Sequence, residues 1–432
     1  MNKNSDFLIE NNVLKSYCGK GGAIVIPNGV TSIDDNVFCD CESLTSVKIP
    51  DSVTTIGAYA FCGCTGLTMV EIPNSVTDIG SGAFINCKCL RKLIIGSSVT
   101  SIGYAAFEGC SSLTEIIIPD SVENIEDEAF WDCYSLKSIV IGSKVKSIGW
   151  DEFKNCNSLT NIHVDENNQN YMSIDGNLYS KDGKILIKYA VCKRATTFEI
   201  PNGVTSIGYG AFRSCRSLIS LTIPESVTSI GGAAFSRCTA LKHITIPSSI
   251  ADIGGEAFAA CRSLQYNEKD GLKYLGNDEN KYLFLVGKLS RSRKTATIDS
   301  NCRIIGDRAF EDRSSLKHVT IPDGIISIGA FAFSGCSSLV SITIPNGITK
   351  IATALFMNCC SLTSVIIPNS VRSIENSFSG CDSLQSITIP DSVTKIGYNL
   401  FGSREEIKTI KGRAGSYAEA FAKEMEIPFE VI

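Results

Sequence analysis

The amino-acid sequence predicts a solenoid, in which similar coils of chain stack along one axis. The pattern IPxxVTxIGxxAFxxCxxLxxI returns with a period of 23 residues, and its Phe recurs fourteen times. A period between about 20 and 50 residues is typical of units that bury their apolar faces only against their neighbours. The repeated aromatic residues are Phe38, Phe61, Phe84, Phe107, Phe130, Phe153, Phe212, Phe235, Phe258, Phe310, Phe333, Phe356, Phe378 and Phe401.

A single coil shows how the pattern closes on itself. In the segment CTGLTMVEIPNSVTDIGSGA, Val70 and Ile72 point inward as a short strand, and Pro73 ends that strand because proline cannot donate a ladder hydrogen bond. Gly80 permits a bend, and Phe84 lies on a short helical or 3₁₀ return. We therefore expect one strand per coil, one continuous parallel sheet, and short helical turns on the opposite face.

The motif resembles a known family. The coils Val30 to Leu44 and Val227 to Leu241 follow LxxLxLPxxLxxIxxxAFxxCxx, the pattern of BspA-like (Treponema pallidum-type) leucine-rich repeats, and most of the chain follows it too. The departures are few: Gly96 and Gly142 replace the Pro, and Arg313 and Arg404 replace the Cys. The resemblance implies a leucine-rich repeat solenoid of the α/β type with about 14 coils, and no cofactor.

Two segments interrupt the period, and both are predicted to be β-hairpin insertions. The first has Asp182-Gly183 as a primed-turn signal, and the second turns at the polar stretch NDEN. Leu14, Leu178 and Leu272 occupy equivalent places in the N-terminal segment and the two insertions. The predicted parts are an N-terminal cap hairpin (1–25), repeat blocks 26–164, 200–266 and 298–410, insertions 165–199 and 267–297, and a C-terminal cap (411–432).

The C-terminal cap departs from the repeat. Residues from Ser416 to Met425 read as a helix with Ser416 as N-cap and Glu419 three residues later, followed by the strand IPFEVI. A terminal unit of different composition covers the open end of a stack.

Composition narrows the function classes. The net charge is -5, so the chain lacks the basic excess of proteins that bind nucleic acid, and no nucleic-acid partner is expected. The sequence as given contains neither a signal-peptide pattern nor 18 consecutive apolar residues, so we expect no membrane span or anchor. It also lacks an Asn-x-Ser/Thr sequon, which favours a bacterial source.

The 19 cysteines mostly form another column. Twelve follow the repeated Phe by three residues, where Cys acts as a small buried hydrophobe rather than as part of a disulfide framework. Cys39 and Cys62, each one residue after the Phe, lie outside this column. With Cys41 and Cys64 they suggest zinc, but four ligands on two faces would distort both coils, so we expect no metal. A Cys39–Cys62 disulfide and free thiols remain alternatives, and free thiols are favoured.

No catalytic motif is present. His163, His243 and His318 fall on outward strand positions of coils that are separated by others, too far apart for one metal site. No HExxH, GxSxG, Walker A loop or dinucleotide fingerprint occurs. We therefore predict that the protein is not an enzyme, and an unrecognised active site in an insertion is the minor alternative.

The outward residues of the predicted sheet contain one unusual group. Ile94, Ile117 and Val140, called here the stripe, share one outward column in three consecutive coils. With the flanking residues Met69, Lys92 and Glu115 they form the candidate partner site. An exposed apolar stripe with a charged rim is typical of a protein-binding surface. The alternative is that β-branched residues there only favour sheet formation.

These observations predict a non-catalytic protein-protein interaction protein that binds through the sheet face. The BspA-like resemblance implies an adhesion role at the bacterial surface or after secretion, with a host matrix or cell-surface protein as partner. The alternative is a carbohydrate-binding solenoid that uses aromatic residues on the bends beyond the sheet. Those aromatic residues are Tyr59, Tyr104, Trp150, Tyr209 and Tyr398.

Overall fold

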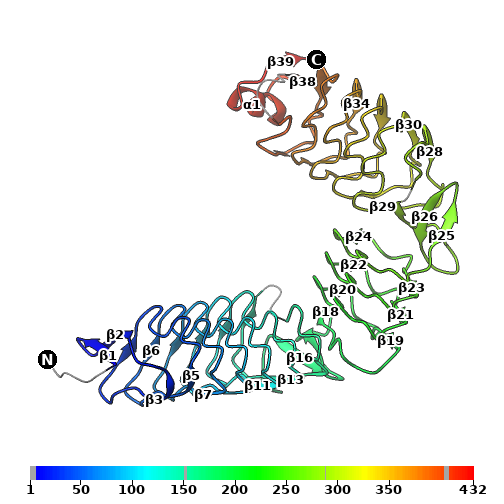
Figure 1. Ribbon diagram of the computed structural model, residues 1–432. Helices are drawn as coiled ribbons and strands as arrows, with labels where there is room; N and C mark the ends of the chain where they lie inside the picture. The colour runs from blue at the N-terminus through cyan, green and yellow to red at the C-terminus, as the bar shows by residue number, and fades with distance from the viewer. Residues whose placement is uncertain (1–5, 150–152, 288, 403–407) are drawn as a thin grey trace.

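The chain folds as a curved stack of coils, with its two ends at the two ends of an open arch (Figure 1). The computed structural model describes residues 6–149, 153–287, 289–402 and 408–432. The predicted solenoid is confirmed. It contains about 18 coils rather than 14, because hairpin and C-terminal strands stack as coils without the repeated Phe.

Each coil holds two strands, where the sequence predicted one. The first series, called the sheet-face strands, comprises β3 (Gly22–Val25), β5 (Leu44–Lys48), β7 (Met69–Glu71), β9 (Lys92–Ile94), β11 (Glu115–Ile117), β13 (Ser138–Ile141), β15 (Asn161–Val164), β19 (Thr197–Glu199), β21 (Ser220–Thr222), β23 (His243–Thr245), β28 (Thr295–Thr297), β30 (His318–Thr320), β32 (Ser341–Thr343), β34 (Ser364–Ile366), β36 (Ser386–Thr388) and β38 (Thr409–Gly412). The second series, called the short strands, comprises β4 (Ser32–Ile33), β6 (Thr55–Ile56), β8 (Asp78–Ile79), β10 (Ser101–Ile102), β12 (Asn124–Ile125), β14 (Ser147–Ile148), β20 (Ser206–Ile207), β22 (Ser229–Ile230), β24 (Asp252–Ile253), β29 (Ile304–Ile305), β31 (Ser327–Ile328), β33 (Lys350–Ile351), β35 (Ser373–Ile374) and β37 (Lys395–Ile396).

Both series pair in parallel, but neither forms the single continuous sheet that was expected. The sheet-face strands divide into ladders such as β3-β5-β7-β9, β11-β13-β15 and β19-β21-β23. The hairpins cause two of these interruptions, because their antiparallel strands enter the stack. In the green part of Figure 1, the short strands β20, β22 and β24 line the inner side of the arch, and the sheet-face strands β19, β21 and β23 line the outer side.

The return segments are hydrogen-bonded turns rather than the predicted short helices. The Cys39 N–H donates to the Asn36 carbonyl, but Asn36 and Asp40 both have a φ of 59°. A left-handed residue in every turn prevents helical propagation. These turns also pair between coils, since the Phe38 N–H donates to the Ala60 carbonyl at 2.7 Å.

The repeated Phe residues form the centre of the core. Phe38 and Phe61 stack with ring centroids 4.8 Å apart, and Phe61 and Phe84 follow at 5.0 Å. At the ends and junctions other aromatic residues extend the column: Tyr17 contacts Phe38, Tyr189 contacts Phe212, and Phe284 contacts Phe258. The pattern had not identified these three additions, because they lie outside the repeat.

Eleven of the twelve column cysteines are buried as predicted, whereas Cys41 is half-buried, and the column has a further role. The Cys64 thiol donates to the Phe38 carbonyl at 3.1 Å, and the Cys87 thiol donates to the Phe61 carbonyl at 3.2 Å. Ten column thiols bind the carbonyl of the Phe 25 or 26 residues earlier in this way. The column is therefore polar as well as apolar, because each of these ten thiols links two coils.

Three hairpins enter the stack. The first is β1 (Phe7–Glu10) with β2 (Val13–Tyr17); the second comprises β16 (Tyr171–Ile174), β17 (Asn177–Ser180) and β18 (Ile185–Lys188); the third comprises β25 (Asn267–Lys269), β26 (Leu272–Leu275) and β27 (Phe284–Gly287). The equivalent residues Leu14, Leu178 and Leu272 are all fully buried. Asp182-Gly183 connects β17 to β18, but the primed turn is Asp175-Gly176, where both φ values are positive.

The C-terminal cap contains the predicted helix and strand. Helix α1 (Tyr417–Glu424) begins at N-cap Ser416, whose hydroxyl accepts from the Glu419 N–H at 3.3 Å. Strand β39 (Phe429–Val431) then pairs in parallel with β38. Buried apolar residues along the chain form three clusters, which begin at Leu14, Tyr179 and Leu272. The exact boundaries of the seven parts stay predictions.

The Phe column gives a direct stability test. Phe107 is fully buried between Phe84 and Phe130, so we expect Phe107→Ala to lower the free energy of unfolding by about 3 to 5 kcal/mol. Thermal or urea unfolding measures the change. The control is Tyr398→Ala, since Tyr398 is 75% exposed and its loss should cost no more than about 0.5 kcal/mol. Equal effects of the two substitutions would place Phe107 outside the core.

The thiol column predicts a loss of stability at alkaline pH. Burial raises the pKa of Cys110 and of Cys336 from 9.0 to about 12. Unfolded thiols ionise first, so their contribution to stability is complete below pH 9.0 and falls as pH rises toward 12. Melting temperatures across this range should fall. Alkylation at neutral pH should label exposed Cys18 and Cys89 but not Cys110; labelling of Cys110 in the native protein would contradict the assignment.

Candidate functional site

The candidate partner site lies on four consecutive sheet-face strands, β7, β9, β11 and β13. Met69 pairs with Lys92, and Ile117 pairs with Val140. Met69, Ile94 and Ile117 are 39, 38 and 67% exposed. Lys92 and Glu115 are exposed, and Val140 is half-buried. All six side chains thus occupy the outward positions assigned to them, and their role in binding stays a prediction.

The stripe crosses a break in the hydrogen bonding. Ile117 and Val140 belong to one ladder, in which the Ile118 N–H donates to the Val140 carbonyl at 2.8 Å. Ile94 belongs to the preceding ladder, although β9 and β11 lie next to each other. The apolar surface is therefore continuous in space over two separately paired groups of strands.

Charged residues precede the stripe in the same outward column. Lys48 lies on β5, Glu71 lies on β7, and Glu71 pairs with Ile94 on β9. Both charged residues are exposed. Along this column the outward residue is charged at Lys48 and Glu71 and apolar at Ile94. The candidate partner site therefore has a polar edge beside an apolar centre.

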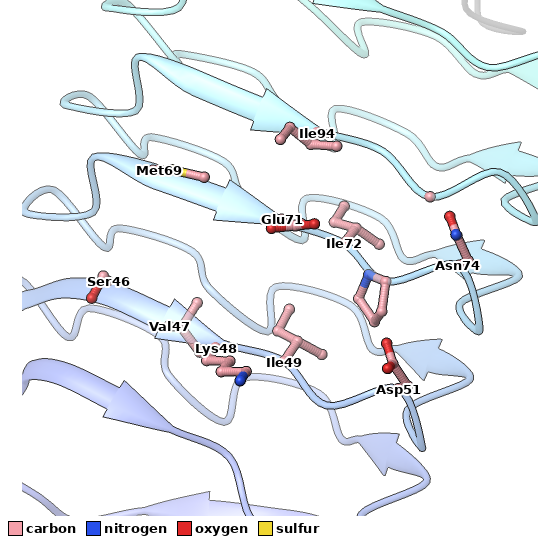
Figure 2. Close-up of a pocket in the computed structure, with 12 residues that line it drawn as sticks. Ser46, Val47, Lys48, Ile49, Asp51, Met69, Glu71, Ile72, Asn74 and Ile94 are labelled. Atoms are coloured by element: carbon pink, nitrogen blue, oxygen red, sulfur yellow. The ribbon is translucent and has the colours of Figure 1, made fainter.

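A hollow of about 390 Å³ lies at this edge (Figure 2). Strands β5, β7 and β9 and the turns after them line it. Its lining residues are Ser46, Val47, Lys48, Ile49, Asp51, Met69, Glu71, Ile72, Pro73, Asn74, Ile94 and Gly96. Of the six predicted site residues, it includes Met69 and Ile94, and the other four lie outside it.

The sequence analysis did not find this hollow, although one signal was present. Gly96 stands where most coils have Pro, and the sequence analysis named it only as a departure from the repeat. A Cβ at Gly96 would lie 2.3 Å from the Pro73 carbonyl oxygen, so this coil requires glycine. Gly96 lines the hollow, whereas Gly142, the same replacement two coils later, does not.

One exposed apolar residue elsewhere on the sheet face deserves comparison with the stripe. Ile366 on β34 is 65% exposed, close to the value for Ile117. Its paired neighbours are Thr343 and Thr388, so it stands alone. A single exposed apolar side chain is ordinary on a protein surface, whereas three outward apolar side chains on adjacent coils form a patch.

The aromatic residues of the carbohydrate alternative that the structure describes lie on the bends after the short strands. Tyr59, Tyr104 and Tyr209 are 41, 44 and 44% exposed. The Tyr59 ring lies against Gly82, where an added Cβ would be 2.5 Å away. The Tyr104 hydroxyl donates to the Glu128 carboxylate at 2.6 Å, and this bond raises the pKa of Tyr104 to about 12. Trp150 lies outside the described residues.

The candidate metal ligands are arranged differently from a four-thiol site. Cys64 faces the core, while the ligand atoms of Cys39, Asp40 and Cys62 lie within 4.8 Å of one another. Burial, and then a hydrogen bond with Cys39, raises the pKa of Cys62 to about 12. His163, His243 and His318 are exposed on the separate strands β15, β23 and β30.

The stacked coils, their parallel strands and the inward Leu, Phe and Cys columns define a leucine-rich repeat protein. A family model of the BspA type leucine rich repeat region, which spans six copies, matches residues 8–97, 77–184, 188–279 and 288–415. The chain therefore belongs to the BspA-type leucine-rich repeat family.

Several solved structures are similar to this chain. A leucine-rich repeat protein from Bacteroides ovatus is 28% identical over 89% of this chain and 94% of that chain, with a TM-score of 0.49. A leucine-rich repeat protein from Eubacterium ventriosum is 23% identical over 90% and 88%, with a TM-score of 0.48. A leucine rich cell surface protein from Faecalibacterium prausnitzii is 29% identical over 93% and 94%, with a TM-score of 0.31. No curated protein matches the chain.

Among the described residues, no helix has both the length and the hydropathy that are required to cross a bilayer.

Proposed function

We propose that this protein is a non-catalytic binding protein that engages a protein partner through the candidate partner site. The observation that carries the proposal is the stripe of Ile94, Ile117 and Val140 on adjacent coils, with exposed Lys92 and Glu115 beside it. An apolar centre surrounded by charged groups is the usual composition of a protein-protein interface. Membership of a leucine-rich repeat family supports the same role.

The hollow beside the stripe suggests how a partner would be anchored. Met69 and Ile94 give it apolar walls, and Lys48 and Glu71 add charged groups to its lining. An aliphatic or aromatic side chain fits such a hollow, and hot spots of binding energy are commonly large side chains seated in pockets. Neighbouring positive and negative charges on the partner would meet Glu71 and Lys48 and set its orientation.

The proposed setting is the bacterial surface or the surrounding medium, with a host matrix or cell-surface protein as partner. This part of the proposal comes from the family resemblance, in which BspA-like proteins act in adhesion. The repeat architecture supports it through its extended surface, since a solenoid presents many coils at once to a large partner.

The test is a binding measurement on a panel of purified host matrix and cell-surface proteins. The triple variant Ile94→Glu, Ile117→Glu, Val140→Glu should bind the captured partner at least roughly 30-fold more weakly, the equivalent of about 2 kcal/mol. Ile366→Glu is the matched control, because Ile366 is similarly exposed on the same face. It should bind as well as the unmodified protein.

Three results would count against the proposal. Unchanged binding by the triple variant would show that the site is wrongly placed. Equal weakening by Ile366→Glu would show a general charge effect. Binding to a glycan array that is lost in Tyr104→Ala and kept in the triple variant would favour the carbohydrate alternative.

A further inference from the structure

Two coils near the N-terminus carry a second pair of thiols outside the core column. Cys39 and Cys62 each follow the repeated Phe by one residue, and both are half-buried and free. The ligand atoms of Cys39, Asp40 and Cys62 all lie within 4.8 Å of one another. We propose that these three residues bind a thiophilic divalent metal ion of the Zn²⁺ class.

The register of the solenoid brings the two thiols together. The Asp40 N–H donates to the Cys62 carbonyl at 2.7 Å, so equivalent residues of the two turns face each other. The Cys39 and Cys62 sulfur atoms lie within 4.8 Å of each other. The pair is therefore held by inter-coil backbone bonds on both sides, rather than by flexible loops.

The Asp40 carboxylate is positioned by a glycine in the next coil. A Cβ at Gly63 would lie 2.1 Å from Asp40 Oδ1, so the carboxylate occupies space that only glycine leaves open. Gly63 also has a φ of 66°, which favours glycine independently. The tripeptides Cys-Asp-Cys and Cys-Gly-Cys thus supply two thiols and a carboxylate that leans toward the second coil.

Other coils repeat this arrangement without the thiols. Asn86 Oδ1 lies 2.6 Å from the Cβ position of Gly109, and Asn358 Oδ1 lies 2.4 Å from that of Gly380. The residues that precede Asn86 and Gly109 are Ile85 and Glu108, which cannot form a two-thiol site. The packing motif is therefore general, while the donor set is special to the coils of Phe38 and Phe61.

The donor set and its spacing suit zinc. Zinc binds thiolate sulfur at roughly 2.3 Å and carboxylate oxygen at roughly 2.0 to 2.2 Å, so neighbouring ligand atoms of a tetrahedral site are roughly 3.5 to 3.8 Å apart. Atoms already within 4.8 Å need only small rotations to reach these distances. Three protein ligands leave the fourth position to water, and the half-buried thiols leave a path for it.

Charge also favours a cation at this position. The Asp40 carboxylate lies within 4.8 Å of both sulfur atoms and attracts a cation. Each thiol would release its proton to solvent as it binds the metal. The neighbouring Cys64 is not available as a fourth ligand, because it is fully buried and its thiol donates to the Phe38 carbonyl.

The test uses the full chain, kept reduced with a phosphine and free of oxygen. Titration with Cd²⁺ should produce sulfur-to-metal charge-transfer absorption that saturates at one ion per chain, and Zn²⁺ should compete for it. Loss of a residue that only hydrogen-bonds to a metal ligand lowers metal affinity by roughly 10- to 100-fold. Cys39 and Cys62 would bind the metal directly, so Cys39→Ser and Cys62→Ser should each weaken binding at least roughly 100-fold. Asp40→Asn should weaken it by about tenfold.

The control is Cys89→Ser, which removes an exposed thiol outside the group and should leave the titration unchanged. Unaltered melting temperatures would show that the serine variants still fold. The proposal is overturned if the unmodified protein gives no charge-transfer band, or if Cys62→Ser binds as tightly. It is also overturned if the protein purifies with a Cys39–Cys62 disulfide and binds no metal after reduction.

Discussion

The structure depends on one constraint: each coil must place its backbone and side chains in register with the next. The Thr54 N–H donates to the Thr31 carbonyl and the Thr77 N–H donates to the Thr54 carbonyl, at 2.8 and 2.9 Å. Such bonds satisfy backbone groups that a single coil would leave unpaired. Because the register is kept, every side chain meets the equivalent side chain of the neighbouring coil, and a 23-residue period in sequence becomes a set of columns in space.

The inward columns show why the repeat tolerates little change. Phe rings stack because their neighbours are Phe at the same height, and a smaller side chain would leave a gap that the rigid coils could not close. At the Cys position, a thiol both fills the space and donates to a carbonyl of the preceding coil. Alanine would fill less of that space and could not donate. The hydrogen bond to the neighbouring coil therefore explains better than hydrophobicity alone why Cys recurs at this position.

The sequence was informative where residues repeat, and less so where they do not. The Phe and Cys columns, the equivalence of Leu14, Leu178 and Leu272, and the C-terminal helix follow from periodicity and capping rules. The second strand of each coil was missed, because a two-residue strand such as Thr55–Ile56 has no pattern of its own and arises from pairing between coils. Tyr189 and Phe284 were missed because tertiary stacking, not period, places them in the aromatic column.

The outward side chains follow the same register, but no core packing restricts which residues they can be. Binding surfaces can therefore form there. A substitution at one outward position changes one side chain, whereas the same substitution in two or three adjacent coils builds a surface. Ile94, Ile117 and Val140 form an apolar stripe in this way, and Cys39 beside Cys62 forms a pair of sulfur donors. In this fold the repeated spacing gives the scaffold, and departures that recur in neighbouring coils are where we expect it to bind.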